Sequence, residues 1–103
     1  MSVDEPNKID FTSVDKARSR VLLSIADHLD WTENEGEHLL MLQEKLNTYL
    51  YFIESGKLVE TYSWAKGWPV VIEIAAKYPM NAEATRFFNL AGQRIAELGF
   101  TLA

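Results

Sequence analysis

A strand-and-helix unit that occurs twice is the feature that most constrains the fold of this chain. The segment "VLLSIADHLDWTENEGEHLLML" from residue 21 matches "VVIEIAAKYPMNAEATRFFNLA" from residue 70 in pattern. Each has an apolar run that alternates with period two, then a polar helix cap, then an amphipathic helix that ends at a glycine. Because both helices need a sheet face to cover, these 103 residues predict one α+β domain with a single core.

Four segments are predicted as strands from their composition and alternation. The runs at 21–26 and 70–75 are apolar on nearly all positions, which indicates central places in the sheet. Two more polar runs, "KIDFTSV" at 8–14 and "KLVETYS" at 57–63, are predicted as edge strands. Each edge strand is expected to form a hairpin with the central strand that follows it.

Two amphipathic helices follow the central strands. The first is predicted over about 33–55, with Thr32 and Glu35 as a capping box at its start. Its apolar stripe has the helical spacing of three and four residues: Leu39, Leu42, Leu46, Tyr49 and Ile53. The second helix is predicted to have Asn81 as its N-cap and to end at Gly99.

The predicted order of elements is ββαββα, and the terminal "FTLA" can add one more strand. From residue 20 onward this order matches a ferredoxin-like variant, a two-layer sandwich with two helices on one face of a mostly antiparallel sheet of four to five strands. The N-terminal strand and "FTLA" compete for one edge, and the sequence leaves both open. Residues 1–8 are predicted as a flexible N-terminus and 9–103 as the domain.

Charge and composition exclude several classes of function. The chain has 15 acidic and 10 basic residues, and the basic ones are scattered. We therefore expect no nucleic-acid partner, because such proteins present a basic surface to phosphates. No apolar run reaches the roughly 18 residues of a membrane span, so no membrane is expected and the cytoplasm is the predicted location. Without cysteine, disulfides and thiolate metal ligands are excluded.

The stretch "DHLDWTENEGEH" at 27–38 holds five carboxylates and both histidines. Its three glutamates lie in the first helical turns, where they complement the helix dipole. A calcium-binding loop fails because the glycine comes one position too late. Asp27, His28, Asp30 and His38 remain. They are either structural, with Asp27 accepting hydrogen bonds and His28 solvated, or they bind a small ligand or a divalent metal such as zinc.

Two further surfaces are candidates for an interface. One is the sheet face left open by the helices, where Leu22, Val71 and Glu73 are expected. The other is the predicted hairpin turn "WAKGWP", which Trp64 and Trp68 flank. Tryptophan is enriched at interaction hot spots, so either surface could bind a partner protein or a second copy in a homodimer.

The block "LSIADHLDW" with "EHLLMLQEKLNTYLYFIESGKLVE" and "VVIEIAAKYP" resembles a family of small bacterial proteins of unknown function. The resemblance extends from about residue 9 to the end. It implies a bacterial, cytoplasmic, single-domain protein and transfers no catalytic residue. The matching polar positions are candidate binding residues as a group: Asp27, His28, Asp30, His38, Gln43, Lys45 and Asn47. Of these, Lys45 and Asn47 are expected on the solvated side of the helix.

The leading hypothesis is a non-enzymatic protein-interaction module, because the chain has no phosphate-binding loop and no nucleophile motif. No cofactor is expected. One specific version is an immunity-type or regulatory protein whose acidic surface neutralises a basic partner. The alternative is a small-ligand or metal-binding protein that uses Asp27, His28, Asp30 and His38.

Overall fold

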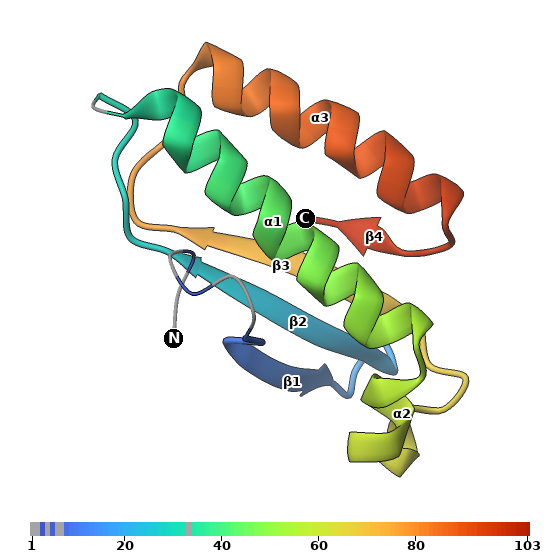
Figure 1. Ribbon diagram of the computed structural model, residues 1–103. Coiled ribbons are helices and arrows are strands. Elements are labelled where there is room, and N and C mark those ends of the chain that lie inside the picture. Colours follow the sequence, from blue (N-terminus) through green and yellow to red (C-terminus); the bar gives the residue numbers. More distant parts are fainter. Residues whose placement is uncertain (1–2, 4, 6–7, 33) are drawn as a thin grey trace.

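The chain folds into two layers, a four-stranded sheet and helices that cover one of its faces (Figure 1). A computed structural model describes residues 3, 5, 8–32 and 34–103. The elements in chain order are β1 (Phe11–Asp15), β2 (Arg20–Asp27), α1 (Glu35–Glu54), α2 (Lys57–Thr61), a 3-10 turn (Ser63–Ala65), β3 (Val70–Ala76), α3 (Ala82–Glu97) and β4 (Thr101–Leu102). The predicted α+β class is confirmed.

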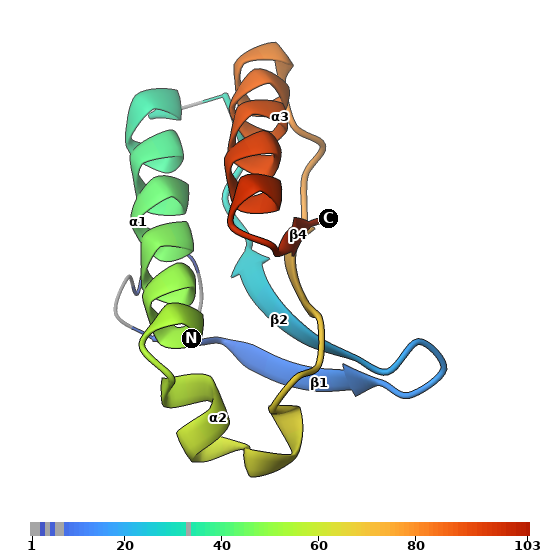
Figure 2. The same cartoon turned by 90° about the vertical axis from the view of Figure 1, so that its right-hand side faces the viewer.

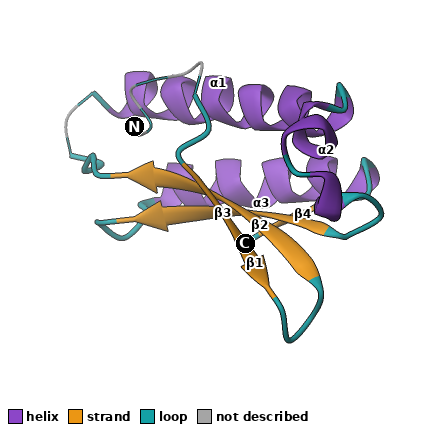
Figure 3. Cartoon of the chain, turned by 90° about the horizontal axis from the view of Figure 1, so that it is seen from below, coloured by secondary structure: helices purple, strands orange, loops and turns teal. Residues whose placement is uncertain are grey.

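The sheet is mixed, so the predicted mostly antiparallel sheet is wrong. Its order is β1-β2-β3-β4, with β1 antiparallel to β2 and both the β2/β3 and β3/β4 pairs parallel. The reason is that α1 and α3 each carry the chain back along the sheet, so that the next strand starts from the same end. This arrangement gives no support to the ferredoxin-like variant. Figure 3 shows α1 and α3 on the same side of the strands.

The predicted strand at 57–63 is wrong, because this segment is helical. It contains α2 and continues into the 3-10 turn. Leu58 is buried, and Tyr62, four residues later, packs against the core, which is the spacing of a helix rather than a strand. The hairpin predicted at "WAKGWP" is therefore absent from this described segment.

The N-terminal strand and the "FTLA" segment, which were expected to compete for one edge, both form strands, at opposite edges of the sheet. β1 pairs with β2, and "FTLA" supplies β4 beside β3, so they do not compete. Of the segment predicted as a flexible N-terminus, residues 1, 2, 4, 6 and 7 lie outside the described part of the chain. Val3 is described: it is buried, and its N–H donates to the Ala26 carbonyl over 2.9 Å.

The helix starts differ in how well the sequence predicts them. α1 begins after Asn34, which has a left-handed conformation and no side-chain capping bond, so the predicted capping box is wrong. Thr32 donates its hydroxyl to Asp30 Oδ1 over 3.1 Å instead, since Asp30 competes for it locally. Asn81 caps α3 as predicted, with its side chain accepting from the Ala84 N–H.

The core lies between the sheet and the helices, which run side by side over it (Figures 1 and 2). The predicted alternation of β2 is confirmed by its burial: Val21, Leu23, Ile25 and Asp27 are buried, and the residues between them are less so. The buried side of α1 includes two polar residues, His38 and Lys45. No helix in the described ranges is long and apolar enough to cross a membrane.

Candidate functional site

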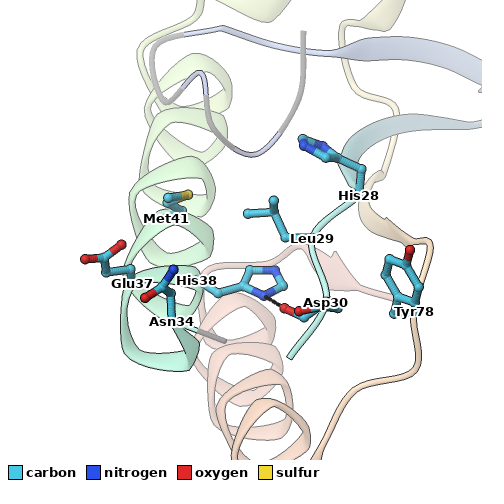
Figure 4. A pocket seen from close by; sticks show the side chains of 8 residues that line it. All are labelled: His28, Leu29, Asp30, Asn34, Glu37, His38, Met41 and Tyr78. Carbon is cyan, nitrogen blue, oxygen red and sulfur yellow. Dashed lines mark hydrogen bonds between the residues drawn. The ribbon is translucent and has the colours of Figure 1, made fainter. Parts of the chain in front are cut away.

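A polar cleft of about 330 Å³ lies where β2 and β3 end and α1 begins (Figure 4). Its polar lining comes from three segments: His28 and Asp30 after β2, Asn34, Glu37 and His38 around the start of α1, and Tyr78 after β3. The cleft thus contains three of the four residues that the sequence singled out between 27 and 38.

Asp27 and His38 form a buried pair behind this cleft. The Nε2 atom of His38 is 2.7 Å from each carboxylate oxygen of Asp27, and its Nδ1 atom is 3.0 Å from the Asp30 carbonyl. Both side chains are almost completely buried. Both ring nitrogens of His38 therefore lie within hydrogen-bond distance of oxygen atoms of the protein.

The Trp31 ring stacks on His38, with centroids 3.5 Å apart and planes 13° from parallel. Stacked rings at this separation gain dispersion energy and bury apolar area on both faces. The Trp31 Nε1 donor is buried without a hydrogen-bond partner among the described residues. Trp31 therefore fixes the position of His38 through its face and not through its N–H.

The pair leaves His38 with no free nitrogen. A histidine that acts as a general base or a zinc ligand needs an unprotonated ring nitrogen directed at the substrate or metal. Of the other residues in the metal hypothesis, His28 is exposed and Asp30 accepts from Thr32. Within the described ranges, no group of three histidine or carboxylate side chains could hold a metal ion. The structural interpretation of Asp27 fits this geometry better.

Lys45 was expected on the solvated side of α1, and this prediction is wrong. Its side chain is fully buried, and Nζ lies 2.8 Å from Asp10 Oδ1 and 2.6 Å from each of the Glu5 and Lys8 carbonyl oxygens. The ammonium group donates hydrogen bonds to the two carbonyls, and its contact with Asp10 is an ion pair. Lys45 therefore fastens the segment that precedes β1 to the buried side of α1.

Tyr49, one helical turn after Lys45, extends the same network. Its hydroxyl donates to the Ser24 carbonyl and accepts from the Asp10 N–H. Asp10 Oδ2 accepts from the Ala26 N–H over 2.9 Å, beyond the end of the β1 pairing. Together these side chains hydrogen-bond the edge of β2 where β1 no longer covers it.

In Tyr49→Phe, the free energy of unfolding is expected to fall less steeply with rising pH in the alkaline range than in the wild type. Burial, with the nearby charge of Asp10, raises the pKa of the Tyr49 phenol above its usual value. Its contribution is thus complete below the unfolded pKa of about 10 and falls above it, by up to about 1.4 kcal/mol per pH unit. Urea unfolding across this range should show a steeper decline in the wild type than in Tyr49→Phe. Equal slopes would contradict the prediction.

A second hollow, about 570 Å³, lies between α1 and α3. Gln43 and Asn47 line it, so two of the predicted binding residues lie apart from the polar cleft. The rest of the wall is mostly apolar, with Leu50 from α1 and Phe87 and Ala91 from α3. This groove has the composition of a contact surface, an apolar floor with amide groups beside it.

Large apolar side chains are exposed on the two helices that form this groove. Seven are exposed in the described part of the chain, and four of these belong to the helical layer: Leu40, Tyr51, Leu90 and Leu98. We name as the outer helical face these four residues together with Gln43, Asn47, Leu50, Phe87 and Arg94. An apolar cluster of this kind on the side of the helices away from the sheet typically marks an interaction site.

The interface residues predicted on the sheet are less available. Val71 is only 4% exposed, so little of its side chain is available for a contact. Leu22 is half-buried, and Glu73 accepts a hydrogen bond from Ser24. Trp64 is exposed and packs edge-on against half-buried Trp68, with ring centroids 5.7 Å apart.

Sequence reasoning missed several residues of these sites. Asp10 was assigned only to a strand, although a carboxylate next to an apolar strand signals a buried partner. Leu90 and Arg94 were not among the predicted binding or interface residues. Their spacing of three and four residues from Phe87 could have revealed them as a second helical stripe.

Comparison with known proteins identifies one family. A family model described as a family of unknown function (DUF6572) matches residues 1–103. No curated protein matches the chain, and no solved structure does.

Proposed function

The chain belongs to the DUF6572 family, whose function is unknown, and we propose that it is a non-enzymatic protein-interaction module. The observation that carries this proposal is the outer helical face. The helices α1 and α3 bury one side against the sheet and also present Leu40, Tyr51 and Leu90 to solvent, each more than half exposed. Removing such surface from water upon binding is favourable by roughly 25 cal/mol per Å² before association costs.

The buried polar groups support the same proposal. The two groups that would be candidates for acid–base chemistry, His38 and Lys45, have their donors directed at protein acceptors inside the core. A catalytic group must reach the substrate directly or through one water. These two residues are better explained as fold-stabilising contacts behind the surface.

The shape of the outer helical face favours a helical partner. Two neighbouring helices with a mostly apolar groove between them can receive a third amphipathic helix, whose apolar residues enter the groove. Gln43 and Asn47 supply amide groups that can hydrogen-bond the polar edge of such a helix. We also propose the exposed Trp64 as a second contact with the partner; it lies in the 3-10 turn after α2.

Leu90→Glu is expected to abolish partner binding, whereas Phe11→Glu is expected to leave it unchanged. The two wild-type residues are matched, since Leu90 is 57% and Phe11 is 58% exposed, but Phe11 lies on β1. Affinity capture from the native host, followed by purification of the captured protein, allows its Kd to be measured with each variant. A buried charge at a contact should weaken binding at least about tenfold.

The contrary result would be equal loss of binding in both variants, or loss only in Phe11→Glu. The second pattern would move the contact to the sheet side of the molecule. Trp64→Ala, measured in parallel, tests whether the aromatic pair takes part.

A further inference from the structure

This inference rests on the proposed function and identifies the partner. We infer that the outer helical face binds a second copy of the chain, with α3 packed antiparallel against the partner's α3 about a two-fold axis. The juxtaposition that carries it is a stripe of four residues on α3, which we name the α3 stripe: Glu83, Phe87, Leu90 and Arg94.

The α3 stripe has the spacing of a helix–helix seam. Its members are separated by four, three and four residues, so they follow one side of the helix, as the contact positions of a coiled coil do. The buried residues of α3, Ala84 and Ile95, lie on a different side and face the core. The stripe is the side of α3 next to the one that packs on the core. Phe87 is half-buried at the border between them, and Leu90 is exposed.

The stripe is complementary to itself in the antiparallel orientation. With the two-fold axis between residues 88 and 89, Phe87 lies opposite Leu90 of the partner subunit, and Glu83 lies opposite Arg94 of the partner subunit. Each apolar pair and each opposite-charge pair then occurs twice, as an isologous interface requires. A parallel arrangement would instead place Glu83 beside the same residue of the other copy, which is unfavourable.

The charged ends of the stripe are available for these pairs. Arg94 makes no ion pair within the described ranges, and it borders the groove between α1 and α3. The Glu83 side chain is 54% exposed, and Arg86 on the same helix donates to both of its oxygens, over 3.1 and 3.4 Å. Because each carboxylate oxygen can accept more than one hydrogen bond, Glu83 can also pair with a cation of the second copy. The groove next to Phe87 gives room for an apolar side chain from the second copy.

Charge reversal at the two ends tests this register. Glu83→Arg places two guanidinium groups opposite each other at each end of the interface, and Arg94→Glu places two carboxylates there. Each single variant should dimerise about tenfold more weakly than the wild type. The double variant Glu83→Arg/Arg94→Glu should regain dimerisation, and an equimolar mixture of the two single variants should form heterodimers, because all end pairs are attractive again.

Native mass spectrometry of the mixture, with one variant isotopically labelled, distinguishes heterodimers from homodimers. Sedimentation over a dilution series gives each dissociation constant, and circular dichroism verifies that every variant is folded. Weaker homodimers of both single variants, together with heterodimers in preference to homodimers, would support the inference. A parallel arrangement already places like charges beside each other in the wild type, so a single reversal would not weaken it. Statistical mixing, or a dimer indifferent to the reversals, would overturn it.

Different experimental results would overturn this inference and the proposed function. A wild type that stays monomeric at every concentration overturns the self-association, while loss of a captured partner in Leu90→Glu would still support an interaction module with a different helix in the groove. A monomer that also captures nothing dependent on Leu90 would overturn both.

Discussion

His38→Phe is expected to lower the free energy of unfolding by about 3–5 kcal/mol, because it leaves the Asp27 carboxylate buried without its closest partner. Phenylalanine retains a flat aromatic ring that can stack on Trp31, so most of the loss is expected to arise from the polar contacts. Among the described residues, Asp27 then keeps the Leu29 N–H, 3.2 Å from its Oδ1, and the Asp30 carbonyl loses the His38 ring nitrogen. Urea unfolding at neutral pH measures the effect.

The control is His28→Phe, at the other histidine of the chain. His28 is exposed, so its replacement should change stability by no more than about 0.5 kcal/mol. The double variant Asp27→Val/His38→Phe should be more stable than His38→Phe, because removing both partners leaves no buried charge unpaired. A loss below about 1 kcal/mol in His38→Phe would show that water or rearrangement compensates for the pair.

The size of this effect matters because domains of this length are marginally stable. A total of about 5–15 kcal/mol is typical, so one broken pair removes a large share of it. In the segment 27–38, the Asp27–His38 pair therefore joins the end of β2 to the start of α1. The exposed remainder of this segment, His28 and Asp30, still lines a cleft on the surface.

The periodic segments were predictable because their apolar residues report directly which side is buried. The alternation in β2 and the stripe Leu42, Leu46 and Tyr49 on α1 required no knowledge of neighbours. Strand direction was not predictable in this way, since it depends on how each helix returns the chain. The segment at 57–63 is short enough for its apolar residues to fit either period, and Gly56, with φ of 87°, allows a second helix to start directly.

The candidate site was predictable only in part because burial of a polar residue depends on its partner. His38, Leu42, Lys45 and Tyr49 are spaced by four, three and four residues, which places both polar residues on the core side of α1. The charge of Lys45 favours the solvated side of α1, whereas its spacing places it on the buried side, and the structure agrees with the spacing. Its partner Asp10 is 35 residues away in sequence, and the carbonyls of Glu5 and Lys8 have no side-chain signal at all.

Lys45→Met is expected to destabilise the fold by about 3–5 kcal/mol, because it leaves the Asp10 carboxylate buried without its cation. Methionine retains the length and apolar stem of lysine, so little volume is lost. The variant should also loosen the segment before β1, which Lys45 binds through two backbone carbonyls. Lys66→Met, at an exposed lysine, is the control and should change stability by less than about 0.5 kcal/mol.

Hydrogen exchange separates the local effect of Lys45→Met from the global one. The Ala26 N–H donates to Asp10 Oδ2, so its protection depends on the position that Lys45 gives to Asp10. Global destabilisation would accelerate the Ala26 amide and the core amides of β3 to the same exchange limit, whereas release of the segment would accelerate Ala26 far more. Wild-type protection at Ala26, with a stability loss below about 1 kcal/mol, would mean that Asp10 is held by Tyr49 and the backbone of β2 without Lys45.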